Sequence, residues 1–254
     1  MWSIARALLW IDPLILLCTV LMGSLSLLAS LWDDRGEWQH RIARRWARML
    51  LAVSGVRVRV SGLNNVPPDT ACVYCANHLS LIDTPLVFGH LPVAFRTLAK
   101  KSLFWIPFLG WHLRRAGHMP VAPEDVRASA RHIVEAARRL SQGISIVIFP
   151  EGARSPDGRV GPFMAGAFHI AIRAGAPVMP ISVLGTEQVH TLGSIIVRPA
   201  QVELRIGRPI PTSGLKRQDA AALSEQVRDA IIGLMNTEPA RVISSAKLAV
   251  PGPN

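Results

Sequence analysis

A histidine and an aspartate lie five residues apart in segment 77–83, directly after a short apolar run. An imidazole that titrates near neutral pH can take a proton from an alcohol, and a nearby carboxylate fixes its tautomer and stabilises the imidazolium that forms. The pair His78 and Asp83 therefore suits acyl transfer to a hydroxyl group. A second interpretation is open, because Ser80 and Asp83 have the spacing of a helix-capping box, in which Asp83 accepts backbone N–H groups and His78 is a turn residue.

A second polar group, Glu151 and Arg154, follows another apolar run in segment 149–155. Gly152 lets the backbone approach a ligand, and Arg154 offers a bidentate fork for phosphate. Glu151 suits a role as acceptor of hydrogen bonds from hydroxyl groups, or as the partner that holds Arg154. The alternative is an ordinary ion pair between Glu151 and Arg154 on a surface loop.

Two lysines, Lys100 and Lys101, end a predicted strand and precede the apolar, aromatic segment 102–111. Pro107 and Gly110 interrupt that segment, so it cannot form one long helix. Lysines beside an apolar surface suit a phosphate contact next to lipid, and they equally suit a charged strand end beside a core loop.

The elements that must position these residues alternate between strand and helix. Strands are predicted over 56–61, 71–76, 94–99, 144–149, 178–184, 194–198 and 201–206, and helices over 83–89, 124–141, 163–174 and 216–235. This order predicts an α/β fold with a largely parallel central sheet flanked by helices. His78 directly follows a strand, and ligands of open α/β sheets bind at the carboxyl ends of strands.

The N-terminal region predicts a membrane-associated helical hairpin. Residues 13–32 carry no charge and are long enough to cross a hydrocarbon core of about 30 Å. Residues 37–53 place tryptophans on one side and arginines 41, 44, 45 and 48 on the other, which is typical of an interfacial helix on anionic lipid. The alternative for 37–53 is a surface helix packed on its own domain. The arginines predict a cytoplasmic membrane location with the rest of the chain on the cytoplasmic side.

Length and composition fit this division of the chain. Its 254 residues suit an anchor at 1–54, one α/β domain at 55–236 and a flexible tail at 237–254. A net charge of +11 favours anionic partners such as phospholipids, phosphorylated substrates, coenzyme A or nucleic acid. The three cysteines are an odd number, which argues against a disulfide scaffold, and alternation places Cys72 and Cys75 on opposite faces of a strand as buried apolar groups.

Four blocks between residues 77 and 181 resemble the lysophosphatidate (1-acyl-sn-glycerol-3-phosphate) acyltransferase family. The family blocks Asn-His-x-x-x-x-Asp, Lys-x-Glu-Leu-x-x-x-Pro-x-x-Gly, Phe-Pro-Glu-Gly-Thr-Arg-Ser and an apolar, proline-containing strand start align in order with Asn77 to Asp83, Lys100 to Gly110, Phe149 to Ser155 and Pro177 to Ile181. Ser102 stands in place of the usual Glu, and Ala153 in place of the usual Thr. Met164 and Ala165 stand where many relatives carry a lysine, and these departures bear on the acyl acceptor more than on the chemistry.

The resemblance implies a membrane-bound enzyme that moves an acyl group from acyl-CoA or acyl carrier protein to the sn-2 hydroxyl of lysophosphatidate, giving phosphatidic acid. It implies that His78, oriented by Asp83, is the general base for direct attack, without an acyl-enzyme, a metal or another cofactor. The substrate-binding residues that it implies are Asn77, Lys100, Phe149, Glu151, Gly152 and Arg154.

Three other functions remain open. One is an acyltransferase for a different lysolipid, such as lyso-ornithine lipid. Another is a non-catalytic, membrane-anchored binder of lipid or nucleic acid. Nucleic acid is not expected as a partner, because the clearest basic cluster lies at 41–48, beside the apolar segment, and not in the globular part. A zinc hydrolase is the weakest reading, since one His and one Asp are too few ligands.

Overall fold

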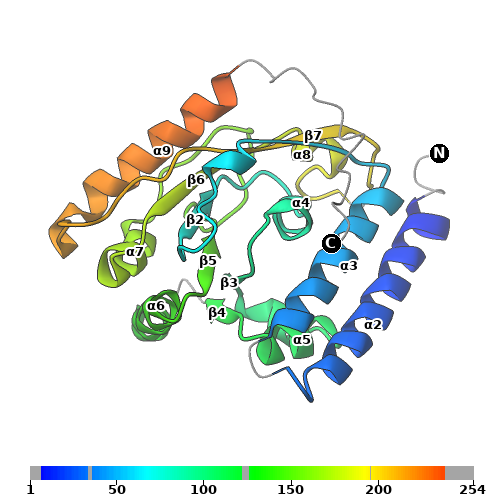
Figure 1. Ribbon diagram of the computed structural model, residues 1–254. Coiled ribbons are helices and arrows are strands. Elements are labelled where there is room, and N and C mark those ends of the chain that lie inside the picture. The colour runs from blue at the N-terminus through cyan, green and yellow to red at the C-terminus, as the bar shows by residue number, and fades with distance from the viewer. Residues whose placement is uncertain (1–6, 34–35, 122–125, 195, 238–254) are drawn as a thin grey trace, which may run out of the picture.

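Seven strands form one mixed sheet in the part of the chain that the structure, a computed structural model, describes: residues 7–33, 36–121, 126–194 and 196–237 (Figure 1). The strand order is β1-β7-β6-β2-β5-β3-β4, and every neighbouring pair is parallel except β6 and β7. The five strands from β6 to β4 therefore share one carboxyl edge. This confirms the predicted α/β class with a largely parallel sheet.

The strands are β1 (Arg57–Ser61), β2 (Val73–Ala76), β3 (Phe95–Lys100), β4 (Met119–Val121), β5 (Ser145–Ile148), β6 (Val178–Leu184) and β7 (Gln201–Ile206). The helices are α2 (Asp12–Ala29), α3 (Glu37–Val53), α4 (Asp83–His90), α5 (Leu109–Arg115), α6 (Val126–Ser141), α7 (Phe168–Ala174), α8 (Thr186–Val189) and α9 (Ala220–Asn236). A π-helical turn lies at Ala7–Ile11, and 3-10 turns lie at Leu63–Asn65, Lys101–Trp105, Ala165–Ala167 and Arg217–Asp219.

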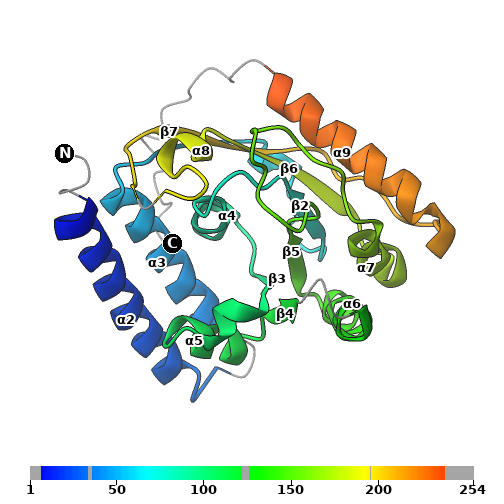
Figure 2. The ribbon, with the colours of Figure 1, turned by 180° about the vertical axis from the view of Figure 1, so that it is seen from behind.

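The sheet separates two hydrophobic cores because its side chains alternate between faces. Along β2, Tyr74 and Ala76 enter the core under α3 and α4, whereas Val73 and Cys75 enter the core under α6, α7 and α9. Figure 2 shows the same three layers from behind. Cys72 lies in the first core and Cys75 in the second, both as buried free thiols, which confirms that they are buried on opposite faces.

The helix α3 packs on its own domain, and two of the four arginines that were expected to face lipid, Arg44 and Arg48, bond to that domain instead. Arg44 Nη2 donates to the carbonyls of Leu91 and Val93 at 2.6 and 3.1 Å, and Arg48 Nε donates to Gly89 at 2.7 Å. These carbonyls lie at and beyond the carboxyl end of α4, where helical acceptors are left open. Helical periodicity showed which residues share a face, but not which neighbour that face meets.

The helix α2 packs against α3 and α5 (Figure 1). Within the described residues, one helical stretch, Leu9–Ala29, has the length and mean hydropathy (2.0) that a membrane span requires, and only 17% of it is buried. Its outer leucines remain exposed: Leu14, Leu16, Leu17, Leu21, Leu25 and Leu28. The inner face is so close to the domain that a Cβ on Gly23 would come within 2.8 Å of the Cβ of Phe108.

Several predicted elements differ from the structure. The segment 194–198, predicted as a strand, is a loop in its described residues. The short elements β4 and α8 were not predicted, and the helix predicted from 163 begins only at Phe168 after a 3-10 turn. Residues 124–125, the start of one predicted helix, and 238–254, most of the predicted tail, lie outside the described residues.

Candidate active site

The histidine of the first block follows β2 at the carboxyl edge of the sheet. Asn77 fixes the chain where it leaves β2. Its side-chain Nδ2 donates to the Val183 carbonyl at 2.9 Å, and its Oδ1 accepts the Val183 N–H at 2.7 Å. The buried amide thereby extends the pairing of β2 with β6. Because all of Asn77 is buried and both ends of its amide are occupied by backbone, the expectation that Asn77 contacts substrate is wrong; it positions His78.

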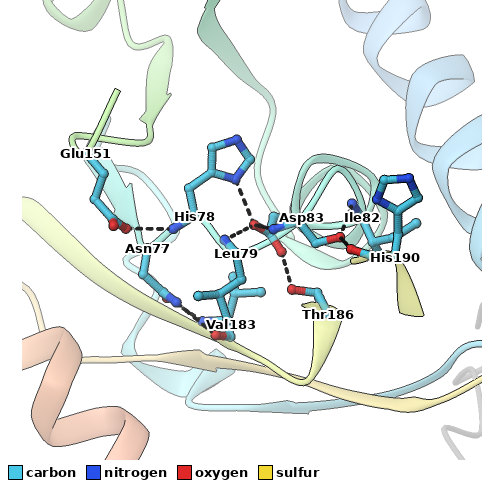
Figure 3. A network of polar contacts seen from close by, with 10 residues as sticks. Asn77, His78, Leu79, Ile82, Asp83, Glu151, Val183, Thr186 and His190 are labelled. Atoms are coloured by element: carbon cyan, nitrogen blue, oxygen red, sulfur yellow. Dashed lines mark hydrogen bonds and ion pairs between the residues drawn. The ribbon is translucent and has the colours of Figure 1, made fainter. Parts of the chain in front are cut away.

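His78 Nδ1 lies 2.7 Å from Asp83 Oδ2 (Figure 3). An ionised carboxylate only accepts hydrogen bonds, so this contact assigns the proton to Nδ1 and leaves Nε2 free as a base. The histidine side chain keeps 18% of its surface exposed, and its ring stacks on Phe149 with centroids 4.3 Å apart. The imidazole is therefore held in one orientation and remains partly accessible to solvent.

Asp83 is also the first residue of the helix α4, which has Ile82 at its N-cap and no side-chain cap, so the predicted capping box is not formed there. Its Oδ2 accepts the backbone N–H groups of Leu79 at 2.6 Å and Ser80 at 2.8 Å in addition to His78. Its Oδ1 accepts the hydroxyl of Thr186. The carboxylate is fully buried, and these donors replace the water that it has lost.

Glu151 holds the peptide of His78. Its Oε1 accepts the His78 N–H at 2.8 Å (Figure 3). Its Oε2 accepts the Gly161 N–H at 3.0 Å. Burial raises the pKa of Glu151, and the two backbone donors oppose that rise. Both oxygens of Glu151 thus hold backbone groups, and its expected contact with substrate stays a prediction.

The loop that follows β5 forms a cavity of about 420 Å³, lined by residues of segment 151–162. Arg154 and Arg159 line this cavity, and the Ser155 N–H donates to the His78 carbonyl at 2.7 Å. Gly152 makes the turn possible with a φ of +71°, a conformation that favours glycine. The helix α9 holds the other end of this loop, because Arg228 Nε donates to the Gly161 carbonyl at 2.9 Å.

The candidate residues do not all meet at one point. His78, Asp83, Phe149 and Glu151 are joined by direct contacts, and Gly152 and Arg154 belong to the loop that bonds to His78. Lys100 is exposed at the same carboxyl edge, but β5 separates its strand from β2, which places β3 about 10 Å from β2.

Sequence reasoning missed Thr186, Gly161 and the His190 carbonyl, which accepts the Ser80 hydroxyl at 2.8 Å. Thr186 carried one signal, a polar residue directly after Gly185 at the end of a buried strand, which is where this fold places its site residues. No group of three or more His, Cys, Asp or Glu side chains gathers as a metal site among the described residues, so the zinc hydrolase has no ligand set there.

The site places the His78–Asp83 pair and an arginine-bearing loop at strand ends of a largely parallel α/β sheet. The model of the acyltransferase family matches residues 57–184, which contain the histidine, the aspartate and the loop. The chain belongs to the acyltransferase family.

Relatives with assigned names agree with this. The chain is 34% identical to 1-acyl-sn-glycerol-3-phosphate acyltransferase BAT2 of Brassica napus over 80% of its own length and 57% of that protein. It is 30% identical to 1-acyl-sn-glycerol-3-phosphate acyltransferase alpha of Homo sapiens over 70% of its length and 63% of that protein. The chain thus spans about three fifths of these two relatives.

A solved structure is similar over nearly the whole chain. The crystal structure of the 1-acyl-sn-glycerophosphate acyltransferase PlsC from Thermotoga maritima aligns with a TM-score of 0.78 and 27% identity. The alignment covers 94% of this chain and 100% of that one.

Proposed function

We propose that the protein transfers an acyl group from an acyl thioester to the sn-2 hydroxyl of 1-acyl-sn-glycerol-3-phosphate, producing phosphatidic acid. The observation that carries this is the attachment of the Arg154 loop to His78: Glu151 and Ser155 hold the peptide of the histidine on both sides. A base and a candidate phosphate site are therefore parts of one rigid unit, as a reaction on a phosphorylated alcohol requires.

In the proposed reaction, His78 carries the proton from the hydroxyl group of the acceptor to the leaving thiolate. Nε2 takes the proton of the sn-2 hydroxyl while the oxygen attacks the thioester carbonyl, and Asp83 stabilises the imidazolium. The carbon–sulfur bond then breaks, and the imidazolium returns the proton to the thiolate, which leaves as a free thiol. Direct attack is favoured because the Ser80 hydroxyl is buried and donates to the His190 carbonyl, so it is not placed as a nucleophile.

We assign the phosphate of the acceptor to the cavity lined by Arg154 and Arg159. Guanidinium groups bind phosphate oxygens through paired, charge-assisted hydrogen bonds. Gly152 shapes the loop, Phe149 holds the plane of the imidazole, and Lys100 at the same edge adds positive charge near the anionic substrates.

We place the protein at the cytoplasmic membrane, with its catalytic part on the cytoplasmic side, where acyl-CoA and acyl carrier protein are available. The exposed leucines of α2 and the exposed side chains of Trp105 and Trp111 support this, because such apolar surface binds lipid. Membrane phospholipids are then the surroundings of both substrates, and an acyl chain reaches the site without passing through water.

The test is a panel of acceptors with the purified protein in detergent, using acyl-CoA and acyl carrier protein as donors. Lysophosphatidate should be acylated faster than lysolipids that lack a phosphomonoester. Arg154→Met should raise the KM for lysophosphatidate about tenfold or more, the loss of one charge-assisted contact. Arg173→Met, an exposed arginine before the opposite end of β6, is the matched control. Preference for a lysolipid without phosphomonoester would replace lysophosphatidate by that acceptor.

A further inference from the structure

The two oxygens of Asp83 are held differently. Oδ2 accepts three donors, His78 Nδ1, the Leu79 N–H and the Ser80 N–H, all from its own segment of the chain. The hydrogen bond recorded for Oδ1 comes from the hydroxyl of Thr186, a residue 103 positions away (Figure 3). Asp83 and Thr186 are both fully buried, so bulk water does not substitute for this hydroxyl.

The backbone fixes Thr186 where its hydroxyl meets Asp83. The strand β6, which pairs with β2, ends at Leu184, and Gly185 turns the chain into α8 with a φ of +78°. A side chain at Gly185 would bring its Cβ within 2.6 Å of the Gln201 carbonyl oxygen, so the turn is tight against β7. The Thr186 carbonyl in turn accepts the His190 N–H at 3.1 Å. Thr186 thus sits on a rigid corner of the sheet.

We propose that Thr186 is a positioning residue for the reaction, acting through Asp83. Its hydroxyl holds the carboxylate so that Oδ2 faces His78 Nδ1, and it stabilises the ionised form against taking the Nδ1 proton when the imidazolium forms. Without the hydroxyl, Oδ1 is a buried acceptor with no hydrogen-bond donor among the described residues, and the carboxylate gains by rotating or by binding a proton. This inference rests on the proposed function, in which His78 is the general base.

Glu151 interacts electrostatically with both His78 and Asp83, and it is fixed by the backbone on two sides. From α8 and the residue after it, two groups contact this segment: the Thr186 hydroxyl, which donates to Asp83, and the His190 carbonyl, which accepts the Ser80 hydroxyl. A change of Thr186 therefore acts on the Asp83 end of the pair without removing a contact of the arginine loop.

The experiment compares Thr186→Val, which removes the hydroxyl at nearly constant shape, with Thr186→Ser, which keeps it. Thr212→Val is the matched control. Thr212 is equally buried and donates to the Ala176 carbonyl at 3.0 Å, but it lies at the opposite end of β6. Each variant is assayed for kcat, both KM values, the pH profile of kcat/KM and thermal stability.

Thr186→Val should lower kcat about 10- to 100-fold, as loss of an outer contact of a catalytic group does, with both KM values within about twofold. The acid limb of its kcat/KM profile should move to higher pH. Thr186→Ser should keep kcat within about threefold and leave the limb in place. Thr212→Val should match the wild type in kcat. A folded Thr186→Val enzyme with wild-type kcat and an unmoved acid limb of the kcat/KM profile overturns the proposal. A fall in kcat in Thr186→Ser as large as that in Thr186→Val overturns it as well.

A second measurement does not depend on the substrate. In protein with ¹⁵N-labelled histidine, the Nδ1–H proton of His78 should resonate far downfield, and Thr186→Val should shift it while Thr186→Ser and Thr212→Val should not. If the wild type acylates no acceptor, the proposed function fails and this resonance still decides the role of Thr186. An unchanged resonance in folded Thr186→Val overturns the positioning role.

Discussion

Glu151 Oε1 accepts the backbone N–H of His78 at 2.8 Å, so the glutamate of the arginine loop holds the peptide of the proposed base. Its second oxygen accepts the Gly161 N–H at 3.0 Å. The loop that lines the cavity and the segment that carries the histidine are therefore one unit, and the position of the base depends on a residue 73 positions away.

Replacing Glu151 by Gln removes one of its two acceptors and sets an amide NH₂ against a backbone N–H. Because His78 loses its position while the cavity arginines remain, kcat should fall about 10- to 100-fold with the lysophosphatidate KM within about threefold. Glu135→Gln, on α6 and paired with Arg138 and Arg139, is the control and should leave both parameters unchanged. A rise in KM with unchanged kcat would show instead that Glu151 binds the acceptor.

Arg44 should contribute to folding and not to lipid binding. Because its guanidinium donates to two carbonyls beyond α4, Arg44→Met should lower the free energy of unfolding by about 1–3 kcal/mol. Arg45→Met, exposed on the same helix, should change it by less than about 0.5 kcal/mol. Denaturant titration measures both. Equal loss in the two variants would contradict the inward role of Arg44.

Three buried histidines should make the protein sensitive to acid. Burial, aided by nearby positive charge, lowers the pKa of His40 to about 3, that of His112 to about 4 and that of His118 well below its ordinary value. A histidine with a lowered folded pKa takes up its proton more readily in the unfolded chain. Stability should therefore be constant above the unfolded value of about 6.5 and should fall as the pH drops toward 4, by up to about 1.4 kcal/mol per pH unit for each histidine.

Denaturation midpoints at pH 7.5, 6 and 5 measure this slope. His118→Asn keeps an acceptor for the Thr97 N–H, which His118 Nδ1 accepts at 3.0 Å, and cannot be protonated. Its pH dependence should be shallower than that of the wild type, whatever its absolute stability. Equal slopes in the two proteins would show that these histidines do not govern acid unfolding.

Two glycines give opposite predictions for the same substitution. A Cβ on Gly110 would overlap the carbonyl of Phe104, so Gly110→Ala should destabilise the protein by about 2 kcal/mol or more. Gly233 on α9 faces open space, and Gly233→Ala should stabilise it by about 0.5–1 kcal/mol. Thermal melting compares the two. A stabilising Gly110→Ala would mean that the turn before α5 is looser than the structure has it.

The sequence predicted what local patterns determine. Alternating apolar runs predicted the parallel sheet, and the spacing of His78 and Asp83 predicted a contact, because one turn separates the two residues. Local patterns could not predict contacts between distant segments. No residue near Glu151 in the sequence indicates that its oxygens accept the N–H groups of His78 and Gly161. Thr186 was missed for the same reason, since its partner Asp83 becomes a neighbour only when β6 pairs with β2.

The most direct test of His78 as the general base is an assay of labelled acyl transfer to lysophosphatidate. The assay uses acyl-CoA and acyl carrier protein as donors and compares wild type with His78→Gln. His169→Gln, on α7 and away from the Asp83 network, is the control. The proposed mechanism predicts turnover by wild type and by the control, and a loss of about 10²- to 10⁴-fold in His78→Gln, the usual contribution of a general base. Turnover by His78→Gln within a few-fold of wild type, with the variant folded, would contradict it.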